Sequence, residues 1–193
     1  MSPCTNPMRS ISVALLVLAA GVPGFCQQRK FSPENLAPSI PTPATVVDRM
    51  LDVAHVKAND VVYDLGSGDG RIVIAAAQKY GAKAVGVEML PDLCRQAQRR
   101  IHELGLDDRA SIVEGNVFHV DFSPATVVTM YFMTDSNERL RPNLERYLKP
   151  GTRVVSNQFP IKGWKPVTVE HVRAEARDGM EYTIYMYEVG KTK

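Results

Sequence analysis

Three glycines between a predicted strand and a predicted helix constrain the fold of this chain more than any other feature. Residues 61–65 are a short run of strand-forming side chains that leads into Asp-Leu-Gly-Ser-Gly-Asp-Gly-Arg at 64–71. An Ala-rich helix is expected over 71–80, ending at Gly81. Glycine lets the backbone turn sharply and lets a ligand approach where a Cβ would clash. The pattern therefore predicts a strand, a tight ligand-binding loop and a helix in succession.

The same alternation of strands and helices continues along most of the chain. Apolar residues recur with helical or strand spacing. Helices are predicted at 44–55, 92–104 and 136–148, and strands at 83–88, 110–113, 125–131 and 153–156. Strands separated by helices require right-handed crossovers, so the sheet they form is expected to be parallel.

The end of the chain differs because no helix separates its last two strands. Strands are predicted at 167–172 and 181–189, joined by a turn that contains Asp178 and Gly179, which is typical of an antiparallel hairpin. The predicted fold class is α/β. We expect a Rossmann-like, seven-stranded, mostly parallel sheet with a C-terminal antiparallel hairpin and helices on both faces. Ligands of such sheets bind beyond the carboxyl ends of the strands.

The N-terminal region has the layout of a leader. Arg9 precedes an apolar run at 11–22, which is shorter than the roughly 20 residues that cross a bilayer. Residues 1–26 are interpreted as a signal peptide or an N-terminal hydrophobic segment, 27–41 as a linker and 42–193 as the domain. The leader predicts an exported or periplasmic protein. The alternative is membrane association through this segment, with the domain facing the cytoplasm.

Composition excludes several functions. The 23 basic and 21 acidic residues give a net charge of +2, too small to predict a nucleic-acid partner. Cys94 is the one cysteine beyond the predicted leader, so neither an internal disulfide nor a cysteine metal cluster is expected. The four histidines show no metal-ligand spacing, and no metal site is predicted.

The charges of the glycine loop indicate the kind of ligand. Its glycines do not follow the dinucleotide pattern G-x-G-x-x-G, because Gly70 comes one position early. Asp64 and Asp69 are also poor neighbours for an anionic pyrophosphate. Acidic walls suit S-adenosylmethionine, which carries an amine and a sulfonium but no phosphate. Glu88, at the end of the next strand, is placed to accept hydrogen bonds from ribose hydroxyls, and Asn116 to reach the adenine edge.

These motifs resemble those of class I S-adenosylmethionine-dependent methyltransferases. The resemblance rests on 64–71, on Gly-Val-Glu at 86–88 and on the order of elements. More narrowly, Pro-Thr-Pro at 41–43, the run at 151–156, Phe-Pro at 159–160 and Trp-Lys-Pro-Val at 164–167 look like the small lysine methyltransferases related to the ATP synthase c-subunit enzyme. An Asn-Pro-Pro-Tyr motif is absent, so methylation of adenine in nucleic acid is not expected.

The resemblance implies S-adenosyl-L-methionine as cofactor and transfer of a methyl group to a lysine amine of a protein substrate. The expected cofactor-binding residues are Thr42, Asp64, Gly66, Ser67, Gly68, Asp69, Glu88 and Asn116. The candidate substrate-lining residues are Tyr131, Thr134, Asp135 and Trp164, with Tyr131, Thr134 and Trp164 forming a polar aromatic cage. Two alternatives stay open: a small-molecule methyltransferase, or an exported, non-enzymatic binding module of the same fold.

Overall fold

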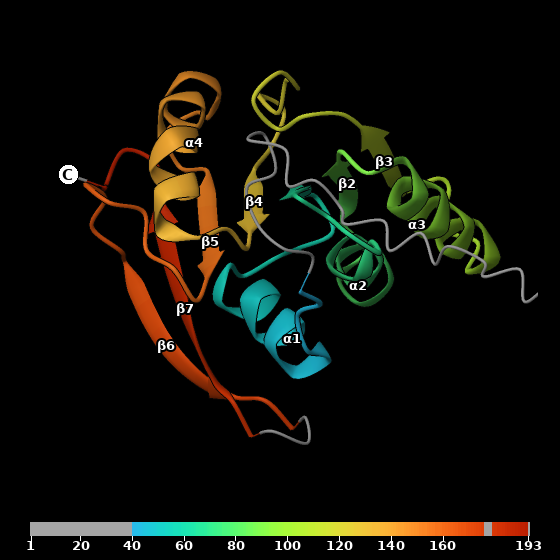
Figure 1. Ribbon diagram of the computed structural model, residues 1–193, viewed down its shortest axis with the longest axis horizontal. Helices are drawn as coiled ribbons and strands as arrows, with labels where there is room; N and C mark the ends of the chain where they lie inside the picture. Colours follow the sequence, from blue (N-terminus) through green and yellow to red (C-terminus); the bar gives the residue numbers. More distant parts are fainter. Residues whose placement is uncertain (1–39, 176–178, 193) are drawn as a thin grey trace, which may run out of the picture. The chain divides into compact units, whose positions relative to one another are not determined.

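The computed structural model describes residues 40–175 and 179–192. The predicted leader, most of the linker and Asp178 of the predicted turn lie outside the described residues. The elements are α1 (Ala44–Val53), β1 (Val61–Leu65), α2 (Arg71–Tyr80), β2 (Lys83–Glu88), α3 (Pro91–Glu103), β3 (Ala110–Glu114), β4 (Val127–Met130), α4 (Thr134–Tyr147), β5 (Arg153–Asn157), β6 (Thr168–Arg173) and β7 (Glu181–Glu188). Figure 1 shows them as one twisted sheet flanked by helices.

The strands form one seven-stranded sheet in the order β3-β2-β1-β4-β5-β7-β6. The first five strands of this order pair in parallel, and β7 pairs antiparallel with both β5 and β6. The predicted fold class, including the terminal hairpin, is confirmed. From β1 the chain builds outward to β3 and then returns to β4, so the strand order reverses beside β1. Ligands of open α/β sheets bind at such a reversal.

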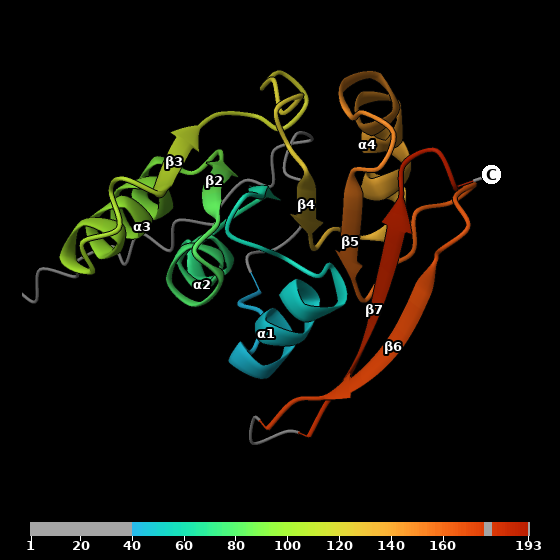
Figure 2. The ribbon, with the colours of Figure 1, turned by 180° about the vertical axis from the view of Figure 1, so that it is seen from behind.

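Two apolar layers cover the sheet. One packs α1 and α2 against the sheet and includes Val62, Val155 and Ile184. The other packs α4 against the opposite face and includes Leu65, Val154 and Tyr187. Figure 2 shows α1 and α4 on different sides of the sheet. Since neighbouring strand residues point to opposite faces, the layer that contains a residue also gives the direction of its side chain.

The element boundaries differ from the predictions by at most two residues. β4 begins at Val127 instead of 125, because the Ala125 amide is bonded within a turn to the Phe122 carbonyl. α4 begins at Thr134 instead of 136. Within the described ranges, no helix combines the length and the apolar character needed to cross a bilayer.

Candidate functional site

The carboxylate of Glu88, at the carboxyl end of β2, is held by two backbone amides. Gly68 N donates to Oε2 over 2.9 Å, and Leu90 N donates to Oε1 over 2.8 Å. Each carboxylate oxygen has a second lone pair for another donor. The side chain is buried, with 6% of its surface exposed. Glu88 therefore presents a fixed pair of acceptors beside the glycine loop, as a ribose diol requires.

Two close approaches explain why the loop and β2 contain glycine. A Cβ on Gly66 would lie 2.8 Å from the Phe132 ring, and the φ angle of Gly66 is +78°. A Cβ on Gly86 would lie 2.5 Å from Ser67 Oγ. That hydroxyl is buried and has no hydrogen-bond partner among the described residues. A buried unpaired hydroxyl costs stability. The close packing of Ser67 against Gly86 is the reason that β2 has no side chain at this position.

Asp64 is the most perturbed acid of the site. It is 3% exposed, and Thr129 of β4 donates a hydrogen bond of 2.7 Å to its Oδ1. Burial raises the pKa of Asp64 to about 7, and the negative charges of Glu88 and Asp69 act in the same direction, against the Thr129 hydrogen bond. A cation bound here favours the charged carboxylate. Asp64 is thus suited to an ammonium or sulfonium group.

Two arginines bind the carboxylate of Asp69, and its expected contact with the cofactor stays a prediction. Arg71 bonds both of its oxygens over 2.8 Å, and Arg100 bonds Oδ2 over 3.0 Å. Burial would raise the pKa of Asp69, but the hydrogen bonds and charges of these arginines outweigh it and lower the pKa. Arg71 also donates to the backbone carbonyl of Thr42 over 2.7 Å. Asp69 therefore fixes the loop to the segment before α1, and Thr42 joins the site through its backbone.

Asn116 follows β3, at the same edge of the sheet. Its Oδ1 accepts a hydrogen bond of 3.0 Å from Phe118 N, so the amide oxygen orients the local loop. The expected contact of Asn116 with adenine stays a prediction.

Cys94 is buried beneath Glu88, and its thiol donates to the Glu88 carbonyl. Burial raises the pKa of Cys94 to about 11, which disfavours a reactive thiolate.

The carboxyl ends of β4 and β5 carry an aromatic pair. Tyr131 and Phe159 stack with their ring centroids 6.2 Å apart and an interplanar angle of 25°. Burial raises the pKa of Tyr131, and nearby Tyr182 raises it further. Thr134 and Asp135 follow in the first turn of α4, Thr134 partly exposed and Asp135 exposed.

The predicted cage of Tyr131, Thr134 and Trp164 is wrong with respect to Trp164. The indole lies in the α4 layer, edge-on to Tyr187, and its Nε1 donates to Glu145 over 3.0 Å. Tyr131 packs against the opposite layer. Phe159, not Trp164, is the aromatic neighbour of Tyr131 because it follows the adjacent strand.

Sequence reasoning missed three polar residues near this edge. Thr129 bonds Asp64. The buried hydroxyl oxygen of Thr45 in α1 and the buried side-chain amide of Asn157 in β5 have no partner among the described residues. Thr129 interrupts a predicted strand that is otherwise largely apolar, and that was the available signal for it. Asn157 lies one residue beyond the strand predicted at 153–156, so no such signal pointed to it. In the part of the chain that the structure describes, no three His, Cys, Asp or Glu side chains are placed to hold a metal ion.

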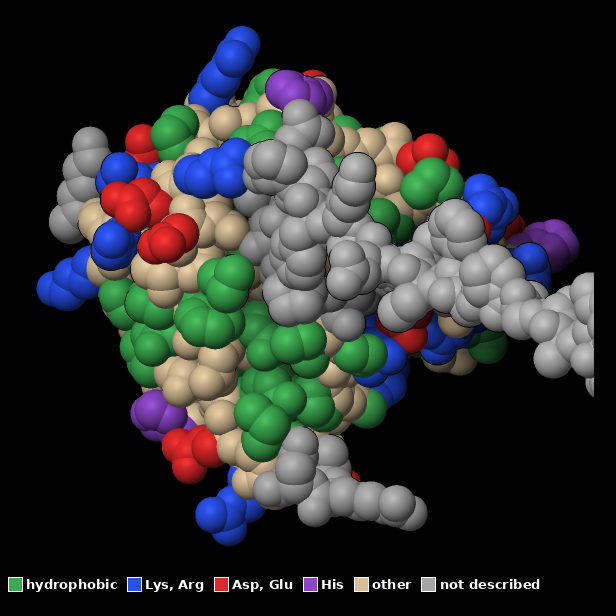
Figure 3. Space-filling view, viewed as in Figure 1, with side chains coloured by type: hydrophobic (Ala, Val, Ile, Leu, Met, Phe, Trp, Pro, Cys, Tyr) green, Lys and Arg blue, Asp and Glu red, His purple; other side chains and the backbone are tan. Residues whose placement is uncertain are grey.

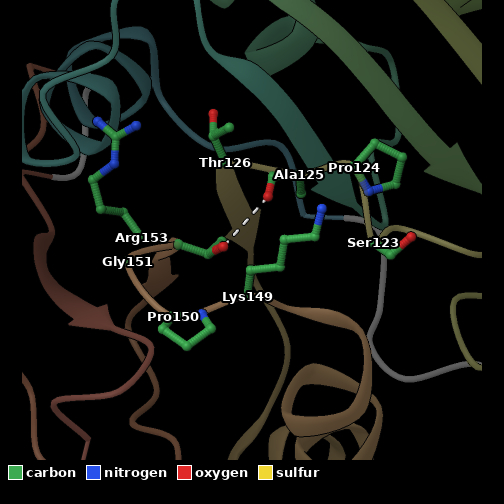
Figure 4. A pocket seen from close by; sticks show the side chains of 9 residues that line it. Ser123, Pro124, Ala125, Thr126, Lys149, Pro150, Gly151 and Arg153 are labelled. Carbon is green, nitrogen blue, oxygen red and sulfur yellow. Dashed lines mark hydrogen bonds between the residues drawn. The ribbon is translucent and has the colours of Figure 1, made fainter.

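A separate hollow of about 320 Å³ lies at the opposite, amino edge of the sheet, before β4 and β5. Figure 4 shows Lys149 extending into it and the guanidinium of Arg153 directed away. The lining contains Ser123 and the buried Thr152, whose hydroxyl donates to the Ala125 carbonyl. None of the acids described above lines this hollow, so it is distinct from the glycine-loop site.

Comparisons with known proteins find related methyltransferases. Residues 64–168 match the ANTKMT methyltransferase domain family. The chain is 52% identical over 158 residues to the protein-lysine N-methyltransferase of Saccharolobus islandicus, an alignment that covers 81% of this chain and 96% of that protein. It is 32% identical to the ATP synthase c-subunit lysine N-methyltransferase of Homo sapiens, covering 78% of this chain and 61% of that enzyme.

Among solved structures, the chain resembles an RNA methyltransferase from Salinibacter ruber in complex with S-adenosyl-L-homocysteine. The TM-score is 0.72 and the identity 45%, and the match covers 78% of this chain and 94% of that one. The sequence expectations of a methyltransferase and of S-adenosylmethionine as cofactor are confirmed by these relatives.

The residues present fit that cofactor. Glu88 offers two fixed acceptors beside the glycine loop, and Asp64 offers a buried carboxyl whose charged form a bound cation favours. The expected contact of Ser67 with the cofactor stays a prediction. The site and the matches over most of the chain lead to one assignment: this protein belongs to the ANTKMT methyltransferase domain family.

Proposed function

We propose that this S-adenosylmethionine-dependent methyltransferase methylates a lysine amine of a protein substrate. The observation that carries the proposal is the stacked pair of Tyr131 and Phe159 at the carboxyl edge, next to the strand that supplies Thr129 to Asp64. Two aromatic faces suit the alkyl chain and the ammonium group of a lysine. The 52% identical archaeal protein-lysine N-methyltransferase supports the same acceptor.

The residues of the chain bind and orient the reactants. When bound, the cofactor supplies a methyl group whose bond to sulfur breaks as the amine lone pair forms the new N–C bond. Asp64 and Glu88 hold the cofactor's cationic and ribose ends, and much of the rate then comes from orientation and exclusion of water. Tyr131 and Phe159 desolvate the acceptor, which lowers the pKa of the lysine and favours release of its proton to water before attack.

One face of the molecule and the small net charge support a protein acceptor rather than a nucleic acid. Figure 3 shows hydrophobic side chains gathered over α1 and the β6–β7 hairpin, with basic side chains scattered at the periphery. Exposed apolar residues of and near the hairpin include Val169 and Met180, at 45% and 50% exposure. A nucleic-acid surface presents a continuous basic patch, and the net charge here is only +2.

Two successive measurements test the function. Calorimetry of the full-length protein with S-adenosylmethionine is expected to show saturable binding that Glu88→Ala weakens at least tenfold, because the two ribose acceptors are lost. Methyl-labelled cofactor is then incubated with a cell extract. Label on lysine that survives ribonuclease and is released by protease supports the proposal.

The other outcomes of the labelling experiment contradict it. Label removed by ribonuclease indicates an RNA acceptor, the acceptor class after which the Salinibacter ruber enzyme is named. Label confined to the low-mass fraction indicates a small-molecule acceptor. Cofactor binding without labelled product indicates a non-enzymatic binding module.

We also propose that the N-terminal region directs the protein out of the cytoplasm. The support is the sequence pattern, with Arg9 before the apolar run at 11–22. Expression with a C-terminal tag, followed by fractionation and mass determination, tests it. An N-terminus after Cys26 and a periplasmic location are expected. An intact N-terminus in the membrane fraction favours the alternative of a membrane-associated domain facing the cytoplasm.

A further inference from the structure

Asn157, the last residue of β5, is a buried polar side chain without a function in the site as described so far. The residue is 0% exposed, and neither Nδ2 nor Oδ1 has a hydrogen-bond partner among the described residues. An amide buried without partners destabilises a fold. The two other buried polar side chains at the ends of β4 and β5 are bonded: Thr129 to Asp64, and Ser156 to the Phe159 carbonyl. Of these three strand-end side chains, Asn157 is therefore the one without a partner among the described residues.

The register of the sheet places Asn157 in the row of site residues. Asp64 pairs with Thr129, and Thr129 pairs with Val155, two residues before Asn157 on the same face of β5. Met130 pairs with Ser156, so the next residues along both strands, Tyr131 and Asn157, are neighbours. Both belong to the α1 side of the sheet, because Val155 lies in that layer and Tyr131 packs against it.

The spacing of the sheet gives the position of Asn157 relative to Asp64. With strands about 4.8 Å apart and about 3.3 Å per residue, their Cα atoms are on the order of 12 Å apart. A side chain at that distance is too far away to bond the Asp64 carboxylate. The Asn157 side chain is near enough to contact an acceptor amine that lies between Asn157 and Asp64.

We propose that the Asn157 side chain binds the acceptor amine, with Oδ1 accepting a hydrogen bond from its N–H. The inference rests on the proposed lysine methylation and assigns a residue for substrate positioning. The bond would turn the amine lone pair in a fixed direction, while Tyr131 and Phe159 line the alkyl chain. The long side chain of lysine is suited to reaching a group below the surface.

The chemistry of an amide fits this role better than that of a carboxylate. An amide oxygen accepts from an amine without a negative charge that would stabilise the protonated, unreactive ammonium. Packing alone does not explain asparagine at position 157, because leucine fills a similar volume without the cost of an unpaired amide. Residues that are kept for function often lower the stability of the folded protein.

Asn157→Leu in the full-length protein separates a binding role from a structural one. We expect its melting temperature to equal or exceed that of the wild type, because an unpaired buried amide is removed. We expect kcat/KM for a lysine-containing protein acceptor to fall about 10- to 100-fold, with cofactor affinity unchanged. Thr152→Val is the matched control. It removes a buried hydroxyl at the amino end of the same strand and is expected to keep kcat/KM within twofold of the wild-type value.

Two further measurements do not depend on turnover alone. The wild type is expected to bind the peptide acetyl-Gly-Gly-Lys-Gly-Gly-amide more tightly than its norleucine counterpart, and Asn157→Leu to lose this preference. Asn157→Asp is expected to shift the pH–rate profile to higher pH, because an added carboxylate stabilises the ammonium form of the acceptor.

The inference is overturned if the wild type methylates lysine and Asn157→Leu keeps both its kcat/KM within twofold and its peptide preference. That result leaves the proposed function intact. A wild type that binds the cofactor but labels no lysine overturns the proposed function itself, so the two failures are distinguishable.

Discussion

At the residue scale, the buried carboxyl of Asp64 makes stability and cofactor binding depend on pH. Its pKa is raised from 3.8 to about 7 by burial. Between pH 3.8 and about 7, the folded state therefore keeps a proton that the unfolded state has released. The free energy of unfolding of the cofactor-free protein decreases as pH rises through this range. Well above this folded-state pKa the contribution is constant. Urea unfolding at a series of pH values from mildly acidic to mildly basic measures the slope.

Asp64→Asn is the corresponding variant, because asparagine has no titrating proton. It is expected to flatten that part of the pH dependence, to be more stable than the wild type at mildly basic pH, and to bind S-adenosylmethionine at least tenfold more weakly. Glu114→Gln, on exposed Glu114 of β3, is the control and is expected to change neither. An unchanged slope in Asp64→Asn would show that Asp64 is not the titrating group.

The residues of the site were predictable where one segment carries the signal. The acidic glycine loop and Glu88 indicated the cofactor, because their positions follow from strand ends alone. Asn157 and Thr129 were missed since their roles depend on neighbours in other strands, and Thr129 is 65 residues from Asp64. Trp164 was misplaced because sequence does not reveal which face of the sheet a loop residue covers.

At the scale of elements, Arg71 connects the first turn of α2 to the segment before α1. Arg71→Ala removes both the Thr42 carbonyl contact and the two bonds to Asp69. We expect faster hydrogen exchange at the amides of Val46 and Val47, which bond to the Pro43 carbonyl, and about tenfold weaker cofactor binding.

Lys79→Ala is a control on the same pair of helices. Lys79 bonds Asp48 over 2.6 Å, but its side chain is 51% exposed, and such pairs contribute little. Its cofactor affinity is expected to equal that of the wild type. Equal exchange rates in Arg71→Ala and Lys79→Ala would contradict a special role for Arg71.

The glycine loop gives a second prediction at this scale. Gly66→Ala adds a Cβ 2.8 Å from the Phe132 ring at a φ of +78°. Gly105→Ala meets the same kind of backbone strain at +65° but has nothing within 4 Å. Gly105→Ala is the control, and we expect this substitution to lower the free energy of unfolding by about 1 kcal/mol. Gly66→Ala should cost about 1–3 kcal/mol more, from overpacking. Equal losses in urea unfolding would contradict the close approach.

At the scale of the whole molecule, the alternation of elements determined the sheet, and the missing last helix determined the hairpin. Both were readable from the sequence because crossover connections and tight turns have distinct lengths. The polar interactions that join distant elements were not readable. Asp60, just before β1, and Arg153, at the start of β5, form such an interaction across 93 residues of sequence.

This pair gives a test of how the amino edge of the sheet is held together. Arg153 bonds Asp60 and also the carbonyls of Ala54 and His55 at the end of α1. Burial would raise the pKa of Asp60, but hydrogen bonds from Thr126 and the Lys57 amide, together with Arg153, outweigh it and lower the pKa. Asp60 thus stabilises the fold above pH 3.8, and this contribution is lost as pH falls through its folded-state pKa.

Arg153→Met leaves the Asp60 carboxylate buried without its cation and is expected to lower the free energy of unfolding by about 3 kcal/mol. Combining it with Asp60→Asn removes the unpaired charge, so the double variant should lose less than the sum of the two single losses. Urea unfolding at neutral pH measures all three. Additive losses would mean that the two side chains act independently. Cofactor affinity is expected to stay unchanged throughout, because this edge lies opposite the glycine loop.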